Sequence, residues 1–247
     1  MILNVLIISD NAELSQHLID TIKSKKIGME LQLKIMHSIS NKSPQAMEAI
    51  GSSPINLKND IEVDECISSY NLIISAHCKQ IFPKKLVNST RCINIHPGFN
   101  PYNRGWYPQV FSIINGLAIG ATIHQMDEEI DHGPIIAQRE VKVEHFDTSY
   151  DVYRKIIEVE KELITENIIR IINNSHPLPT IPVIDGNYNS IQSFKDLCQI
   201  KLNNVDTFEN HLKLLRATTH QNFNNSYYIG NDNKKYYIQI KIIKEQP

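Results

Sequence analysis

Apolar and polar residues alternate in short blocks through the first forty residues of the chain. Residues 3–9 (LNVLIIS) form a continuous apolar run, which is typical of a strand buried on both faces. Residues 11–22 carry leucine and isoleucine at helical spacing behind good N-cap residues, and residues 31–36 alternate as a second strand. This β-α-β opening predicts an α/β fold with a Rossmann-like, doubly wound, mostly parallel sheet.

The middle of the chain predicts further strands and two helices of the same domain. The clearer helix spans 149–173, because its isoleucines and leucines recur on one broad face with charges opposite. The other helix is expected at 107–115. Residues 38–60 carry Ser, Asn, Pro and Gly with little periodicity, which indicates an irregular excursion. The further strands are expected at 70–76, 92–95, 119–127 and 135–143.

The composition changes after the linker-like segment 176–182 (HPLPTIP). Beyond it we expect a helix around 208–218 and a terminal hairpin, with Asn-Asp-Asn between two Tyr- and Ile-rich runs. The chain is therefore predicted to divide into a catalytic domain, 1–183, and a small α+β region, 184–247. The aromatic hairpin is expected to pair two subunits in a homodimer or to wall a ligand pocket.

Charge and cysteine usage narrow the class of protein. The 247 residues include 25 Lys and Arg against 27 Asp and Glu, a formal charge of −2 that offers no general attraction to nucleic acid. The four cysteines are scattered without metal-ligand spacing, so we expect reduced thiols and no metal. The apolar start lacks the features of a signal peptide, and no apolar run is long enough to cross a bilayer. We expect a cytoplasmic protein with no membrane partner.

Glycine-rich phosphate motifs are missing from this sequence. Neither G-x-G-x-x-G nor G-x-x-x-x-G-K-[ST] occurs, so a dinucleotide or P-loop site is disfavoured. Ligands of open α/β sheets bind outside the carboxyl ends of the strands. The functional residues are therefore expected at those strand ends.

Two strand ends carry polar residues suited to acyl transfer. Asn94 and His96 project to the same side of one strand, which Pro97-Gly98 then terminates. The strand at 119–127 runs into an acidic turn that contains Asp131. A neutral imidazole can accept a proton from an attacking amine, and a neighbouring carboxylate orients it. A carboxamide N–H can donate to the oxygen of a tetrahedral intermediate. Taken singly, each residue is equally compatible with packing, capping or an ordinary turn.

The ordered segment 94–138 carries a more specific signal. NIHPGFNPYNRGWYPQVFSIINGLAIGATIHQMDEEIDHGPIIAQ resembles the signature region of the N10-formyltetrahydrofolate-dependent formyltransferases. The resemblance implies the formyltransferase fold, N10-formyltetrahydrofolate as co-substrate, and Asn94, His96 and Asp131 as catalytic residues. The His-x6-Asp spacing from His124 selects Asp131 over Asp127. In that family the pterin lies against the loop after the central strand, which implies that Gln80, Ile81 and Phe82 contact the folate together with Asp131.

The acceptor is expected to be a nucleotide-linked amino sugar. The turn after the first strand lacks the Gly-Ser-Gly pattern of the glycinamide-ribonucleotide enzymes, and the tail lacks the basic character of the methionyl-tRNA enzymes. Segments 75–80, 101–107 and 215–220 resemble the branch acting on dTDP-linked amino-deoxysugars. The resemblance, with the aromatic and cationic character of these segments, indicates one set of substrate-binding residues. The set is His77, Lys79, Tyr102, Asn103, Arg104 and Trp106.

Several alternatives stay open from the sequence. The favoured acceptor is a dTDP-4-amino-4,6-dideoxyhexose, above all the glucose isomer, and the product would enter surface-polysaccharide (O-antigen) synthesis. The 3-amino-3,6-dideoxyhexose isomer is the nearest alternative. A formyltetrahydrofolate hydrolase would use the same three catalytic residues with water in place of the amine. A third alternative is a folate- or sugar-nucleotide-binding module without activity. The intact set of Asn94, His96 and Asp131 argues against it.

Overall fold

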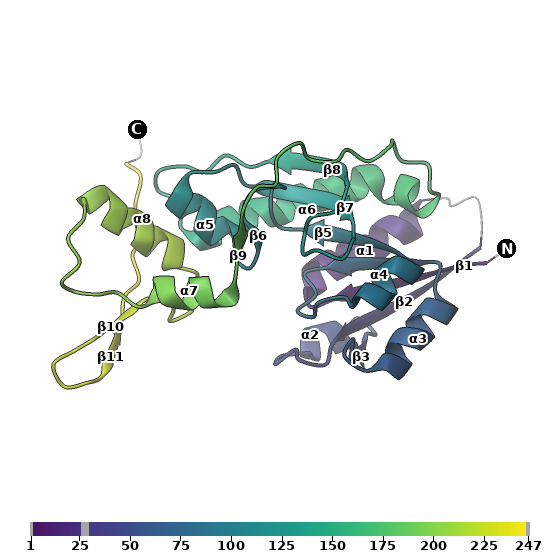
Figure 1. Cartoon of the computed structure of the whole chain (residues 1–247), viewed down its shortest axis with the longest axis horizontal. Coiled ribbons are helices and arrows are strands. Elements are labelled where there is room, and N and C mark those ends of the chain that lie inside the picture. The colour runs from purple at the N-terminus through teal and green to yellow at the C-terminus, as the bar shows by residue number, and fades with distance from the viewer. Residues whose placement is uncertain (1, 26–29, 246–247) are drawn as a thin grey trace.

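A seven-stranded sheet forms the centre of the computed structural model, which describes residues 2–25 and 30–245 (Figure 1). The strand order is β3-β2-β1-β4-β5-β7-β8. The first five strands in this order are parallel to one another, and β7 and β8 extend the sheet antiparallel. The strands span Leu3–Ser9 (β1), Leu31–Ser38 (β2), Ser53–Ile55 (β3), Leu72–Ala76 (β4), Arg91–His96 (β5), Gly120–Gln125 (β7) and Ile135–Glu140 (β8).

Helices cover both faces of the sheet, which confirms the predicted doubly wound α/β fold. Val5 and Ile7 of β1 face the larger core, and Leu6 and Ile8 of the same strand face the smaller one, as period-two alternation requires. The larger core is closed by α1 (Ala12–Ser24), α5 (Pro108–Asn115) and α6 (Ser149–Ile172), and the smaller core by α3 (Asp60–Ser69) and α4 (Lys84–Ser89). Because both faces are buried, β1 and β4 have apolar runs at residues 5–8 and 72–74.

The prediction that 38–60 is irregular was wrong. This segment forms the short helix α2 (Gln45–Glu48) and the edge strand β3, which pairs with β2. Helices α3 and α4 were also missed. Helix α3 buries only Val63 and Cys66, and α4 has six residues, so neither has enough apolar positions to show a helical period. These elements are fixed by packing on the sheet rather than by local pattern.

The C-terminal region lies at the end of the molecule away from β1–β3 (Figure 1). It contains α7 (Ile191–Cys198), α8 (Phe208–Thr218) and the predicted hairpin of β10 (Tyr227–Ile229) and β11 (Lys235–Tyr237). Before it, β9 (Tyr188–Asn189) pairs with β6 (Arg104–Gly105), so the linker returns to the catalytic region. The predicted boundary between residues 183 and 184 stays a prediction.

Within the described residues, no helix combines the length and apolar character that a membrane span needs.

Candidate active site

Strands β5 and β7 bring the central polar residues together. Asn94 pairs with His124 in the antiparallel register, and His96 pairs with Thr122 two residues away. Period-two alternation places all four side chains on one face of the sheet, the face of the smaller core. His96 is the last residue of β5, so it lies where the parallel strands end. The structure thus places Asn94 and His96 at the predicted strand end.

Asp131 reaches this point from the turn after β7. Its backbone has φ 50°, a left-handed conformation that is uncommon for a residue with a side chain. The Asn100 side chain donates to the Asp131 carbonyl at 2.8 Å, and the Gly105 N–H donates to Oδ2 at 3.1 Å. Asn94 Nδ2 donates to Oδ1 at 2.9 Å. Contacts from three segments therefore fix the carboxylate beside β5.

His96 is a buried imidazole with one free nitrogen. Its Nδ1 lies 3.5 Å from Asp131 Oδ2, and its Nε2 has no hydrogen-bond partner among the described residues. Burial lowers the pKa of His96 to about 4, although the Asp131 charge favours the protonated form. Burial opposes ionisation of Asp131, but His96, His124 and the Gly105 N–H lower the pKa of Asp131 to about 2. Near neutral pH the site therefore contains a neutral imidazole beside a carboxylate.

His124 is a fourth member of the site that the sequence analysis used only as a spacing mark. Its Nε2 lies 3.3 Å from Asn94 Nδ2 and 3.7 Å from Asp131 Oδ1, and its Nδ1 lies 2.7 Å from the Gln125 carbonyl. Because that carbonyl can only accept, Nδ1 carries a proton. The sequence places His124 within the strand expected at 119–127, and the antiparallel register of the structure brings it opposite Asn94.

Asn94 uses its amide hydrogens within the site. Nδ2 faces both Asp131 and His124, so both hydrogens have acceptors within the site. The predicted contact with a formyl oxyanion therefore requires one of these hydrogens to turn to the substrate. In the structure, Asn94 aligns the Asp131 carboxylate.

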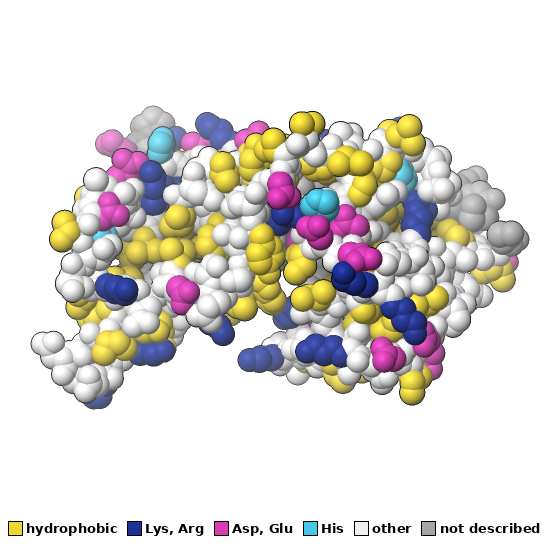
Figure 2. Space-filling view, viewed as in Figure 1, with side chains coloured by type: hydrophobic (Ala, Val, Ile, Leu, Met, Phe, Trp, Pro, Cys, Tyr) yellow, Lys and Arg dark blue, Asp and Glu magenta, His cyan; other side chains and the backbone are white. Residues whose placement is uncertain are grey.

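A cavity of about 610 Å³ opens in front of these residues. Its walls come from the loop after β4, the turn that contains Asp131, the start of α6 and the segment that follows α8. In Figure 2 hydrophobic side chains gather between the sheet domain and the C-terminal region. Aromatic side chains line the cavity away from the acidic turn; they are Trp106, Tyr107, Tyr150, Tyr153, Phe194, His220 and Phe223. A volume of this size accommodates a drug-sized ligand with apolar contact surface.

The predicted folate loop borders this cavity. Gln80, Ile81 and Phe82 all line it, but they differ in what their side chains do. Gln80 accepts from the Leu57 N–H at 3.0 Å and donates to the Ile55 carbonyl at 2.9 Å, so it anchors the loop to β3. Phe82 is buried in the smaller core, and Ile81 is exposed. Ile81 is thus the side chain of the three that is free to cover a ligand, and the folate contacts stay a prediction.

The predicted acceptor residues divide into two groups. His77, Lys79 and Trp106 line the large cavity. Tyr102, Asn103 and Arg104 do not line it, and their contact with the acceptor stays a prediction. The Asn103 side chain is fully buried and forms hydrogen bonds with three other amides, those of Asn115, Asn187 and Asn189.

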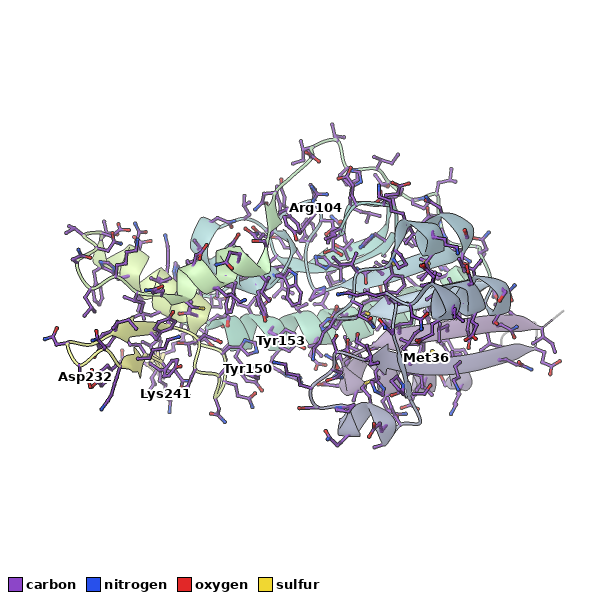
Figure 3. All side chains as sticks on the ribbon, turned by 60° about the horizontal axis from the view of Figure 1, so that its bottom comes forward. Met36, Arg104, Tyr150, Tyr153, Asp232 and Lys241 are labelled. Carbon is purple, nitrogen blue, oxygen red and sulfur yellow. The ribbon has the colours of Figure 1, made fainter. Side chains whose placement is uncertain are left out.

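Arg104 lies outside the large cavity. It borders a separate cavity of about 240 Å³, and Figure 3 shows it apart from Tyr150 and Tyr153. Its guanidinium lies 3.6 Å from Asp185 and 3.9 Å from Glu129. His132 pairs with Asp127 at 2.8 Å within the acidic turn. Across residues 2–25 and 30–245, His, Cys, Asp and Glu form no cluster suited to a metal ion.

Comparison with known proteins agrees with this fold. Residues 3–168 match the formyl transferase family, and residues 193–244 match the C-terminal dimerization domain of N-formyltransferases. The chain belongs to the formyl transferase family. It is 39% identical over 232 residues to a dTDP-4-amino-4,6-dideoxyglucose formyltransferase of Mycobacterium bovis, which covers 93% of this chain and 97% of the relative.

Two solved structures have the same architecture over nearly the whole chain. A sugar N-formyltransferase from a Shewanella species superposes with a TM-score of 0.95 at 41% identity, covering 99% of each chain. A 4-N formyltransferase from Francisella tularensis superposes with a TM-score of 0.91 at 43% identity, covering 98% of each. Within the family, the protein is thus a sugar-nucleotide N-formyltransferase.

Proposed function

We propose that the protein transfers a formyl group from N10-formyltetrahydrofolate to the 4-amino group of dTDP-4-amino-4,6-dideoxyglucose. The observation that carries the proposal is one continuous cavity that joins the His96–Asp131 pair to both the folate loop and the aromatic wall. The relative from M. bovis supports the choice of sugar and nucleotide. The co-substrate follows from the family and from the position of the loop that contains Ile81.

His96 is the base of the proposed reaction. Asp131 favours the tautomer with a proton on Nδ1, which leaves the unpartnered Nε2 as the acceptor. The low pKa of His96 keeps this nitrogen unprotonated at neutral pH, so it is ready to take the proton of the attacking amine. The adjacent carboxylate then stabilises the imidazolium.

The formyl group passes from N10 of the folate to the amine nitrogen of the sugar in two steps. The amine nitrogen bonds to the formyl carbon and its proton passes to His96, while negative charge develops on the formyl oxygen. An Asn94 N–H stabilises that oxygen, a contribution of about 2.7–4 kcal/mol for a comparable donor. The bond from carbon to N10 then breaks, and N10 takes the proton from His96. The products are the formamido sugar and tetrahydrofolate.

The nucleotide is assigned to the aromatic wall. His220 lies edge-on to Tyr150 at 5.4 Å and to Tyr153 at 5.5 Å, and Phe223 lies 5.9 Å away. Burial lowers the pKa of His220, so this wall is neutral and suited to a base or a deoxysugar. Lys79 supplies a cation at the mouth of the same cavity.

The C-terminal region is proposed to form the interface of a homodimer. Its match to a dimerization domain supports this, and Tyr236 and Tyr237 of the hairpin are exposed in the single chain. The same region supplies His220 and Phe223 to the cavity wall, so it completes the acceptor site as well. We further propose a cytoplasmic enzyme whose product enters surface-polysaccharide synthesis.

A panel of acceptors tests the proposed function. The protein is mixed with N10-formyltetrahydrofolate and dTDP-linked 4-amino or 3-amino sugars, and tetrahydrofolate release and acceptor mass are followed. Formylation of the 4-amino sugar at least ten times faster than of the 3-amino sugar is expected. Faster reaction of the 3-amino isomer would overturn the assignment of the amine position. Release of tetrahydrofolate without any acceptor would instead indicate a hydrolase.

A further inference from the structure

A buried histidine–glutamate pair borders the large cavity outside the catalytic group. His77 directly follows β4, and its Nε2 lies 2.9 Å from both carboxylate oxygens of Glu160 in the middle of α6. The Glu160 side chain has no exposed surface, and among the described residues it makes no other hydrogen bond. The backbone of His77 has φ 54°, an uncommon conformation that turns the ring towards α6. The pair therefore persists at a cost in backbone strain.

The number of protons shared by His77 and Glu160 determines whether Nδ1 of His77 is a donor or an acceptor. An unpaired negative charge on fully buried Glu160 is unfavourable, and burial raises the pKa of Glu160. The pair is therefore neutral overall, with its mobile proton on either partner. If Glu160 carries that proton, it donates to Nε2 and the ring proton is on Nδ1. If His77 carries it, both ring nitrogens are protonated. In each case the Nδ1–H of His77 is a donor.

The Nδ1–H has no partner of its own in the described part of the chain, and His77 lines the cavity. The wall around it has few other groups for an anion. Among the described cavity-lining residues, Lys79 alone is a lysine or arginine, while four acidic residues line the opposite turn. An anionic acceptor group is repelled by that turn and attracted towards His77 and Lys79.

We propose that His77, with its donor nitrogen set by Glu160, binds a phosphate oxygen of the acceptor's diphosphate beside Lys79. This inference rests on the proposed function, because it assumes a nucleoside diphosphate sugar. His77 contacts substrate, whereas Glu160 is a positioning residue that acts through the histidine ring. The pair thereby aligns the sugar with His96. It also accounts for the one carboxylate among the buried side chains of α6.

Binding of dTDP and of thymidine distinguishes a phosphate contact from general damage. The Glu160→Gln variant removes the carboxylate at nearly constant shape, and Glu162→Gln is the matched control on the exposed side of the same helix. Loss of a charge-assisted hydrogen bond should weaken dTDP binding about 10- to 100-fold in Glu160→Gln. Thymidine binding, followed by NMR titration, should stay within twofold of the unmodified protein. The control should match the unmodified protein with both ligands.

The kinetic readout separates positioning from a structural role. Glu160→Gln should raise KM for the sugar nucleotide by the same factor and leave KM for the folate unchanged. The 15N shifts of His77 should report a protonated Nδ1 in the unmodified protein and a mixture of tautomers in the variant. Equal weakening of dTDP and thymidine, or unchanged dTDP binding, would overturn the inference.

A second variant covers the case in which Glu160→Gln is unstable. His77→Asn with Glu160→Met replaces both partners, since asparagine tolerates the left-handed backbone and methionine fills the apolar space. It should show the same selective loss of dTDP affinity; unchanged dTDP affinity would again refute the inference. Failure of the unmodified protein to bind dTDP would instead refute the proposed function. The two failures are therefore distinguishable.

Discussion

Gly98 leaves the space that the His96 ring occupies. A Cβ atom at position 98 would lie 2.3 Å from His96 Nε2 and 2.7 Å from Cδ2, whereas ordinary contacts begin at 3.4 Å. The backbone there is held by Thr122, whose hydroxyl donates to the Gly98 carbonyl at 2.7 Å and accepts from the Asn100 N–H at 3.1 Å. In the Gly98→Ala variant the imidazole must therefore move rather than the chain.

The size of the effect follows from that displacement. Restoring an ordinary contact moves the His96 ring by about 1 Å, and a misplacement of that size costs about 100-fold in rate. We expect kcat for formyl transfer to fall by about this factor, with KM for the folate unchanged. Tetrahydrofolate release under saturating co-substrates is the assay. A variant crystal structure should show the imidazole turned away from position 98.

Gly116→Ala is the matched control for this substitution. Gly116 has φ 71° and ends α5, and a Cβ there meets nothing within 4 Å. Alanine in this left-handed position costs about 1–2 kcal/mol of stability but does not touch the site. Gly116→Ala should lower the melting temperature and leave kcat unchanged. Gly98→Ala should lower kcat and leave the melting temperature unchanged. A near-normal kcat in Gly98→Ala would refute the assignment of His96 Nε2 as the reacting nitrogen.

Further predictions address the other residues of the site and the tail. His96→Asn and Asp131→Asn should each lower kcat by about 10²–10⁴-fold with a native circular dichroism spectrum, and a near-normal rate in either would contradict the catalytic assignment. The His96 ring should stay neutral in 15N NMR until the pH falls towards about 4, because burial disfavours its charged form; protonation near pH 6.5 would show that the site is hydrated. Asn103→Ala should reduce the free energy of unfolding by about 1–3 kcal/mol through unpaired buried amides, with unchanged KM for the sugar nucleotide; a raised KM would restore it as a binding residue. Tyr237→Asp should shift sedimentation towards monomer, and an unaltered dimer would exclude the hairpin from the interface.

The predictions that succeeded depended on local periodicity. Residues 5–8 are apolar without interruption because β1 is covered on both faces, and the pattern in 149–173 is that of α6 on the larger core. Asn94 and His96 were found for the same reason: side chains two apart on a strand share a face. The weakly patterned α2, β3, α3 and α4 were missed because their burial depends on the sheet beneath them.

Residue type alone did not show which of the predicted substrate-binding residues line the large cavity. Arg104 and Asn103 looked suited to a polar ligand, yet the structure uses Asn103 in a buried amide cluster and places Arg104 against the smaller cavity. Conversely, nothing in the local sequence of α6 distinguishes Glu160 from the exposed glutamates around it. Its burial depends on His77, which lies 83 residues away in the chain.

The sequence by itself determined the sheet, the order of its central elements, and Asn94 and His96 on one face of a strand end. It did so because a strand or helix that packs in a buried sheet domain has apolar residues at a regular spacing. This spacing can be recognised within a short stretch of the sequence. The tertiary structure alone decided that His124 joins the group, that Gly98 makes room for the imidazole, and that Glu160 pairs with His77. These contacts join residues far apart in the chain, and their energies depend on distance and burial, which no local pattern records.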